Sequence, residues 1–252
     1  MNKYGFSKIK KVKVFFLTSV ILIFIFKSNV CAQNKTYFGF EAAITNDVYE
    51  ISDNGSDLKS VRIVEGFWGF NFRQDINNYL FLEIGLIRNY YDEGFGFKTT
   101  GSIGSTDAMK AWIIPLRLGT KINLCNRKIF LVPVIGYSFC ISPDHPSRKS
   151  GSGYIKANND SVSFNFSSYA GLTRHFTLLQ TGIGFEFKLF NTAILSINTN
   201  YYTGFQKIIQ LDINYKSNNL PQMTGHGFSK GEFWNLGVGL KYPISSFWKK
   251  KS

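Results

Sequence analysis

Histidines are the residues of this sequence best suited to acid–base chemistry near neutral pH, and it has three of them. His145 stands beside Asp144, with hydroxyl groups nearby at Ser147 and Ser150. A hydroxyl, an imidazole and a carboxylate brought together could catalyse hydrolysis or acyl transfer. Asp-His-Pro is also typical of a turn, and we expect no Gly-x-Ser-x-Gly elbow to support a nucleophile. We therefore keep a surface hydrolase or acyltransferase as an alternative rather than as the expected function.

The other candidates for site chemistry are weaker. His226 lies in a second polar segment and is kept beside His145 as a possible base, whereas His175 falls near the expected end of a strand. Asn158-Asn159-Asp160 and Asp53-Asn54-Gly55 each resemble part of a calcium loop without completing one. His, Cys and Asp do not recur at metal-ligand spacing. We expect no enzymatic activity, no metal and no cofactor.

Charged residues recur at alternate positions inside otherwise apolar segments. If these segments are strands, the charges share one face of a sheet. So many charges are too costly for the dry core of a soluble protein, but they could pair across the lumen of a barrel and fix its strand register. The alternative is a proton or ion path, as in a small-solute channel. The expected lumen network comprises Glu41, Glu65, Glu83, Glu186, Arg73, Arg117, Lys121, Lys188 and Lys241.

Four basic residues fall on the opposite face of the same pattern, near one end of the expected strands. They are Arg62, Arg88, Lys110 and Lys207. Cations at that height of a membrane barrel would meet the lipid A phosphates of lipopolysaccharide. Ordinary snorkelling at the membrane boundary is the alternative. We expect contact with lipid and lipopolysaccharide here.

The elements that must position these residues are strands. Residues 112–124 and 234–244 alternate apolar side chains with polar or small ones, and residues 80–86 and 179–189 follow the same period. Further strands are expected to begin near Tyr37, Val61, Lys128 and Ala193. The total is about eight strands, an allowed even number for a membrane barrel.

The connections between these segments differ in length in a regular way. Short turns are expected around 75–78, 125–127 and 190–192. Long polar loops are expected at 45–58, 92–107, 142–170 and 208–230, because these stretches are rich in Gly, Ser, Asn and Asp. Short turns at one end and long loops at the other are typical of outer-membrane barrels. The predicted fold is therefore all-β, an antiparallel up-and-down transmembrane β-barrel.

The first thirty residues have a different composition. Five lysines precede an apolar run from Val14 to Phe26. At about 13 residues the run is too short for a membrane-spanning helix. Val30-Cys31-Ala32 then matches a signal peptidase site, so we expect a cleaved signal peptide at 1–32 and one barrel domain at 33–252. A lipid-modified Cys31 is the alternative.

Net charge and cysteine content bear on two further questions, nucleic-acid binding and disulfide bonds. The chain has 29 basic and 16 acidic residues, a net charge of +13, and six of the basic residues belong to the expected signal peptide. No basic tract with interleaved aromatic residues indicates a nucleic-acid groove. Cys125 and Cys140 are expected near opposite ends of one strand, beyond disulfide reach, as free thiols.

Two segments resemble the PorT-like family of outer-membrane β-barrel proteins. They are Trp112-Ile113-Ile114-Pro115-Leu116-Arg117-Leu118-Gly119 and the closing Leu236-Gly237-Val238-Gly239-Leu240-Lys241-Tyr242. The resemblance covers most of the mature chain and implies the barrel fold and the outer membrane of a Gram-negative-type bacterium. Some relatives are linked to assembly of a machine that secretes proteins across that membrane. The basic tail from Ser246 departs from the family, which usually stops near a terminal aromatic residue, and no functional residue is carried over.

The expected function follows from the fold and the resemblance together. The interior of an eight-stranded barrel is about wide enough for its own side chains, so no open pore is expected. We expect a structural, binding, secretion or envelope-assembly role. The expected partners are membrane lipids, lipopolysaccharide and envelope or secretion proteins, with no nucleic acid, and the protein is expected to be a monomer.

Overall fold

The computed structural model describes residues 35–61, 63–92, 94–101, 103–105, 109–125, 128–143, 146–157, 159–189, 193–218 and 220–244. These residues belong to one compact unit, 35–252. The expected signal peptide, Arg62, Asp144 and His145 lie outside the described residues. Within the described part of the chain, no helix has the length and hydropathy to cross a membrane.

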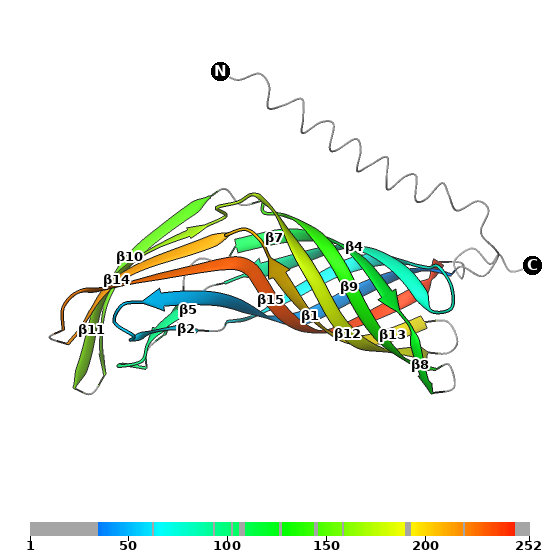
Figure 1. Cartoon of the computed structure of the whole chain (residues 1–252), viewed down its shortest axis with the longest axis horizontal. Coiled ribbons are helices and arrows are strands. Elements are labelled where there is room, and N and C mark those ends of the chain that lie inside the picture. The colour runs from blue at the N-terminus through cyan, green and yellow to red at the C-terminus, as the bar shows by residue number, and fades with distance from the viewer. Residues whose placement is uncertain are drawn as a thin grey trace, which may run out of the picture. The chain divides into compact units, whose positions relative to one another are not determined.

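Eight antiparallel strands close into a barrel, because the first strand pairs with both the next barrel strand and the last strand (Figure 1). In order around the barrel they are β1 (Thr36–Asp53), β3 (Val64–Asp75), β4 (Leu80–Tyr91), β7 (Met109–Thr120), β9 (Ile129–Ile141), β12 (His175–Leu189), β13 (Ala193–Gly204) and β15 (Met223–Pro243). A short strand, β8 (Ile122–Cys125), pairs with the start of β9. The predicted eight-stranded antiparallel barrel is confirmed.

Alternation of side chains gives the barrel an apolar outside and places buried polar and charged side chains inside. In β15, Trp234, Leu236 and Leu240 are about half exposed, whereas Asn235 and Lys241, at the alternate positions, are buried. Exposed Phe, Leu and Ile side chains cover the other barrel strands in the same way. An apolar outer face of this kind suits a hydrocarbon solvent, whereas a water-soluble barrel would be polar outside.

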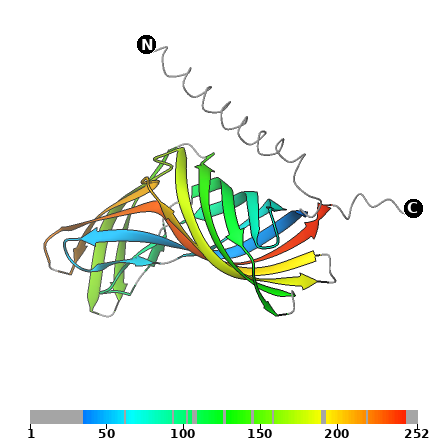
Figure 2. The same cartoon turned by 45° about the vertical axis from the view of Figure 1, so that its right-hand side comes forward.

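The stretches predicted as long loops are mostly strands, so that prediction is wrong. The structure gives β2 (Leu58–Val61), β5 (Gly94–Phe97), β6 (Ile103–Ser105), β10 (Ser147–Ala157), β11 (Asp160–Ala170) and β14 (Ile209–Ser217). Strands β14, β11 and β10 continue the barrel sheet outward from β15, and β2, β5 and β6 form a separate three-stranded sheet. Figures 1 and 2 show this extension beyond the end of the barrel opposite the described chain ends.

A bend in two long strands creates the extension. Gly231 of β15 has a φ of 76°, a left-handed conformation that glycine adopts without strain. Opposite it, the register of β1 shifts between Val48 and Glu50. Beyond the bend, β15 exchanges its partner β13 for β14. The distal halves of β1 and β15 therefore leave the barrel and enter a second sheet assembly.

We call this assembly the distal sandwich: β2, β5 and β6 against β10, β11, β14 and the distal ends of β1 and β15. Its core joins Leu58, Phe95 and Phe97 to side chains of β11 and β14. On β14 the apolar residues sit at alternate positions, with Gln210, Asp212, Asn214 and Lys216 on the opposite face. The loop prediction failed because it weighed the polar face alone and missed the alternate apolar residues.

Candidate functional site

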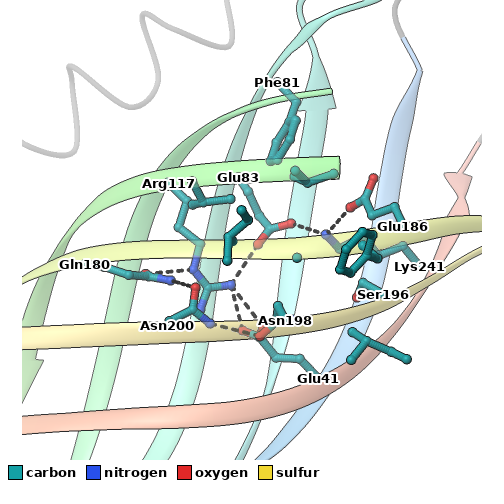
Figure 3. Close-up of a pocket in the computed structure, with 16 residues that line it drawn as sticks. Glu41, Phe81, Glu83, Arg117, Gln180, Glu186, Ser196, Asn198, Asn200 and Lys241 are labelled. Carbon is teal, nitrogen blue, oxygen red and sulfur yellow. Dashed lines mark hydrogen bonds and ion pairs between the residues drawn. The ribbon is translucent and has the colours of Figure 1, made fainter. Parts of the chain in front are cut away.

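Arg117 on β7 lies at the centre of the barrel lumen (Figure 3). Its Nη1 donates to Glu41 Oε1 at 2.9 Å and to Glu83 Oε1 at 2.8 Å. Its Nε donates to Gln180 Oε1 at 3.0 Å, and its Nη2 donates to the Tyr202 hydroxyl at 3.2 Å. One planar guanidinium thus ties β1, β4, β12 and β13 to β7.

Lys241 and Arg73 extend these contacts toward the end of the barrel where the described chain begins and ends. Lys241 Nζ lies 2.8 Å from Glu83 Oε2 and 3.2 Å from Glu186 Oε1. The Arg73 guanidinium forms ion pairs with Glu186 and, at 3.0 Å, with Asp75. Each cation therefore sits between two carboxylates.

A glycine makes room for the side chain that supports Arg73. The Arg73 guanidinium carbon lies 3.6 Å from the centre of the Phe81 ring, a close cation–π contact. The ring in turn covers Gly119 of the neighbouring strand, where an added Cβ atom would collide with it. The absence of a side chain at residue 119 is thus a packing requirement of the network.

Asp75 completes the network by a second contact, at 2.8 Å, with Lys121. Four carboxylates and four cations then face one another without excess charge. We call these eight residues the charged layer: Glu41, Glu83, Glu186, Asp75, Arg73, Arg117, Lys121 and Lys241. Removing any one member takes an ion-pair partner from at least one other charge of the layer.

The structure brings together most, but not all, of the expected lumen residues. Lys121 pairs with Asp75, which the sequence reading had placed in a turn. Glu65 and Lys188 lie outside the charged layer. Glu65 is half-buried near the distal end of β3, and Lys188 is exposed near the opposite end of the barrel, with its Nζ 4.9 Å from the centre of the Phe130 ring. Both residues follow the strand alternation, but they lie beyond the height at which the charges meet.

Amide side chains join the charged layer to β15 and were missed by sequence reasoning. Gln180 Nε2 donates to Asn200 Oδ1 at 2.9 Å, and Asn200 Nδ2 donates to Asn235 Oδ1 at 3.0 Å. A search for formal charges could not find them. The same alternation that identified Glu186 and Lys241 places these amides inside the barrel and would have found them.

The space left within the charged layer is small. A cavity of about 40 Å³ lies among Glu41, Glu83, Arg117, Glu186 and Lys241 (Figure 3). Because a single water needs about 10–15 Å³ of such space, the cavity could hold only a few waters. Among the described residues, side chains fill most of this part of the barrel.

A second layer, of different chemistry, fills the lumen on the distal side. Tyr202 and Phe233 stack with ring centres 4.3 Å apart, and Tyr91 packs against Phe233 at 5.7 Å. None of the layer's buried residues is more than 4 % exposed. We call the following set the apolar layer: Phe67, Ile87, Tyr91, Met109, Ala111, Ile113, Cys140, Ala170, Phe176, Leu178, Tyr202, Ile208, Ile209 and Phe233.

Three of the four basic residues expected on the outside can be placed. Arg88 is half-buried, with its guanidinium 5.7 Å from the Trp112 ring and in register with Trp68. Lys110 is exposed, two residues beyond Trp112 toward the distal end. Lys207 is exposed, with Nζ 4.4 Å from the centre of the Phe228 ring. Cations beside aromatic rings are typical of the membrane boundary.

His226 does have a carboxylate partner. Its Nδ1 lies 2.8 Å from Asp212 Oδ1, and Gln210 Nε2 donates to the other Asp212 oxygen at 3.1 Å. Ser52 is its neighbour in register on β1. The His226 side chain is 67 % exposed, so this grouping lies on an open sheet face rather than in a cleft that excludes water.

A further serine motif escaped the sequence reading. Residues 227–231 read Gly-Phe-Ser-Lys-Gly, the spacing of a nucleophile elbow. Ser229 lies within β15, is 3 % exposed, and its Oγ accepts a hydrogen bond from the Gly231 backbone amide at 3.0 Å. The required strand–turn–helix context is missing, and Ser229 and His226 occupy opposite parities of one strand.

The sequence also led to predictions about free thiols and metal sites. Cys125 is exposed on β8 and Cys140 is buried on β9, so they do not share one strand as expected, but both are free, as predicted. Among the described residues, no group of three or more His, Cys, Asp or Glu side chains could hold a metal ion.

Comparison with known proteins supports no family name. No family model and no curated protein matches the chain. Among solved structures, it is similar to the outer membrane protein OprG of Pseudomonas aeruginosa, at 12 % identity over 82 % of this chain and 96 % of that one, with a TM-score of 0.48. Neisserial surface protein A gives 12 % identity over 84 % and 100 %, with a TM-score of 0.44. The outer membrane protease OmpT of Escherichia coli gives 8 % over 86 % and 99 %, with a TM-score of 0.39.

These similarities are too distant to carry an argument about role. The fold class rests on the chain's own structure: a closed antiparallel barrel, apolar outside and with buried charges inside, is the architecture of outer-membrane barrels.

Proposed function

We propose that this protein is an outer-membrane barrel without an open pore, which holds the distal sandwich at the cell surface and acts by binding there. Its role is then structural or interactive. The family resemblance adds a candidate setting, in which the sandwich assists secretion or envelope assembly. No step of this role needs a solute to cross the barrel.

One observation carries the proposal: two successive layers of side chains fill the lumen. The charged layer crosses the barrel with paired side chains and leaves a cavity of about 40 Å³. The apolar layer then fills the distal half with buried rings and aliphatic side chains. An ion or polar solute would have to break buried ion pairs and also enter an apolar constriction.

The lack of a pore can be tested with the purified protein in lipid vesicles. We expect vesicles that contain the folded protein to swell in an isosmotic sugar solution no faster than protein-free vesicles. Folding is checked in the same sample, because an intact barrel migrates faster before boiling than after it. Rapid swelling by the unboiled, fast-migrating form would contradict the proposal.

The surface location of the distal sandwich can be tested by labelling cysteines in intact cells. In a Cys125→Ser background, Tyr154→Cys places a thiol on β10, where the side chain is 66 % exposed. Tyr79→Cys is the matched control, since Tyr79 is 69 % exposed in the short turn at the opposite end. An impermeant maleimide should label only Tyr154→Cys, and the reverse pattern would show the opposite orientation.

We also propose that Arg88, Lys110 and Lys207 contact the phosphates of lipopolysaccharide. Arg88 lies beside the half-buried Trp112 ring and in register with the exposed Trp68, and Lys110 lies just beyond Trp112, on the side that the proposal places outward. Arg88→Gln with Lys110→Gln should lower the unfolding midpoint in vesicles that contain lipopolysaccharide. The same variant should match the native protein in phosphatidylcholine vesicles. An equal loss in both lipids would mean that the two residues only snorkel.

A surface hydrolase is the second candidate, favoured by the contact between His226 and Asp212. Its test is the release of p-nitrophenol from p-nitrophenyl acetate and p-nitrophenyl octanoate. Under the binding proposal, native protein and His226→Gln should give the same slow background rate. Turnover by the native protein that disappears in His226→Gln would favour the hydrolase.

A further inference from the structure

The distal sandwich presents one sheet face to solvent, and we call it the outer sheet face. Strands β10, β11 and β14 lie side by side on it, so that residues in register form rows. One row contains Ser152, Asn165 and Asn214, and the next contains Tyr154, Ser163 and Lys216. Hydroxyl, amide and phenol groups therefore dominate these two rows, with a formal charge at Lys216.

This face is hollowed near the tip of the sandwich. A hollow of about 510 Å³ is lined by the two rows and by Gln222. The neighbouring residues Phe164 and Tyr215 turn into the sandwich core. A volume of this order falls within the range of small-molecule and cofactor sites, about 300–1,000 Å³.

Polar side chains in the hollow differ from those in the lumen in their hydrogen bonding. Gln180, Asn200 and Asn235 bond to one another inside the barrel. By contrast, Asn165 and Asn214 have no side-chain hydrogen-bond partner among the described residues, and both are exposed. Their donors and acceptors are available to a ligand, because the fold does not use them.

Tyr154 supplies the apolar surface of the hollow. Its side chain is 66 % exposed and lies beside the amide row. An exposed ring flanked by amides and hydroxyls matches the two sides of a sugar: the C–H groups of a pyranose ring pack on an aromatic face, and its hydroxyls both donate and accept hydrogen bonds. A purely apolar ligand would contact only Tyr154, and a ligand that only forms hydrogen bonds would contact only the amides and hydroxyls.

We propose that the hollow of the outer sheet face binds an oligosaccharide. A pyranose ring packs on Tyr154, and its hydroxyl groups bond to Asn165 and Asn214. Only Lys216 among the lining residues carries a charge, which does not suit a polyanionic nucleic acid. The lining also lacks the apolar cluster that a docked protein would bury. The inference rests on the proposed function, since the site must face outside the cell.

The test measures binding of the full-length protein in detergent to three immobilised probes: neutral hexose chains, N-acetylhexosamine chains and uronic acid chains. We expect retention on at least one probe. Tyr154→Ala and Asn214→Ala should each weaken it at least tenfold. Tyr79→Ala removes an equally exposed tyrosine from the opposite end and should bind as the native protein does.

The outcomes separate this inference from the proposed function. The fast-migrating band before boiling shows that each variant has folded. Binding to none of the three probes, or binding that both hollow variants retain, would overturn the oligosaccharide site. Neither result would alter vesicle swelling or maleimide labelling, on which the sealed barrel and its orientation depend.

Discussion

Two layers of the same lumen are closed by opposite chemistry. In the charged layer, Arg117 alone contacts four side chains through directional donors, and each contact needs a specific partner. In the apolar layer, contacts such as that between Tyr202 and Phe233 are between rings and depend on shape and volume. The charged layer thus fixes which strands face one another, whereas the apolar layer excludes water. A substitution in the charged layer should lower stability by an amount that depends on which charges remain. A substitution in the apolar layer should lower stability by an amount that depends on the volume removed.

The largest effect is expected from Arg117→Ala. It leaves Glu41 and Glu83 buried without their shared donor, and breaking a buried pair in this way costs about 3–5 kcal/mol. Urea unfolding in phosphatidylcholine vesicles, followed by the shift in electrophoretic mobility, measures the loss. Arg148→Ala, which removes an exposed arginine of β10, should stay within about 0.5 kcal/mol of the native protein. Equal losses of stability in Arg117→Ala and Arg148→Ala would contradict the role of Arg117 as the shared donor to Glu41 and Glu83.

The next effect tests whether charge balance, rather than any single residue, stabilises the layer. Lys241→Met should cost about 3 kcal/mol, because Glu83 and Glu186 both lose a cation. Adding Glu83→Gln leaves Glu186 with Arg73, and Arg117 with Glu41. The double variant should therefore recover about 1–2 kcal/mol in the same urea experiment. Purely additive losses would show that the pairs act independently.

A smaller effect is expected in the apolar layer. Ile113→Val removes one buried methylene group and should cost about 1 kcal/mol. Because no charge is exposed or lost, the cost should be the same at pH 5 and pH 8. Leu118→Val is the matched control on the outer face of the same strand, where Leu118 is 42 % exposed. A cost at Ile113 that changes with pH would place water or charge in this layer.

The smallest effect concerns the distal sandwich and its response to acid. Burial acts to raise the pKa of Asp57, but hydrogen bonds from Ser217 and Thr99 outweigh it, so the pKa lies below its usual value. A carboxyl group with a lowered pKa stabilises the fold above its usual pKa of about 3.9, and this stability is lost as the pH falls through the lowered value.

Proteolysis of the sandwich by pepsin at different pH values measures this loss. Resistance of the native protein should fall as the pH drops below about 4. Asp57→Asn should be more sensitive at pH 5, with little further change on acidification, while the barrel band persists. An identical acid response in native and variant protein would show that Asp57 does not cause the acid sensitivity of the sandwich.

The lumen charges could be predicted from the sequence because they interrupt an apolar alternation. Glu83, Arg117 and Lys241 each stand between two outward apolar residues, so their inward direction follows from strand geometry. Their partners could not be assigned in this way, since pairing depends on the relative heights of strands that are far apart in sequence. Asp75 was missed for a related reason: it ends a strand at a turn, where alternation gives a weak signal.

The apolar layer and the distal sandwich were not predicted, for two different reasons. Inward Ile87, Ile113 and Phe233 look like any other apolar strand residues, and only closure of the barrel shows that they meet in its lumen. The strands of the sandwich carry many Ser and Asn residues on their outer face and include several Gly residues, and this composition also suits loops. Their apolar partners, such as Val162 and Ile213, face a sheet from elsewhere in the chain.

Single-channel recording in planar bilayers tests the central claim, that two layers close one lumen, most directly. Arg117→Ser with Lys241→Ser opens the charged layer, and Tyr202→Gly with Phe233→Gly opens the apolar layer. We predict no stepwise current from the native protein or from either double variant, because one layer still fills the lumen. The combination of all four substitutions should conduct. Stepwise current through the native, fast-migrating protein would contradict the claim.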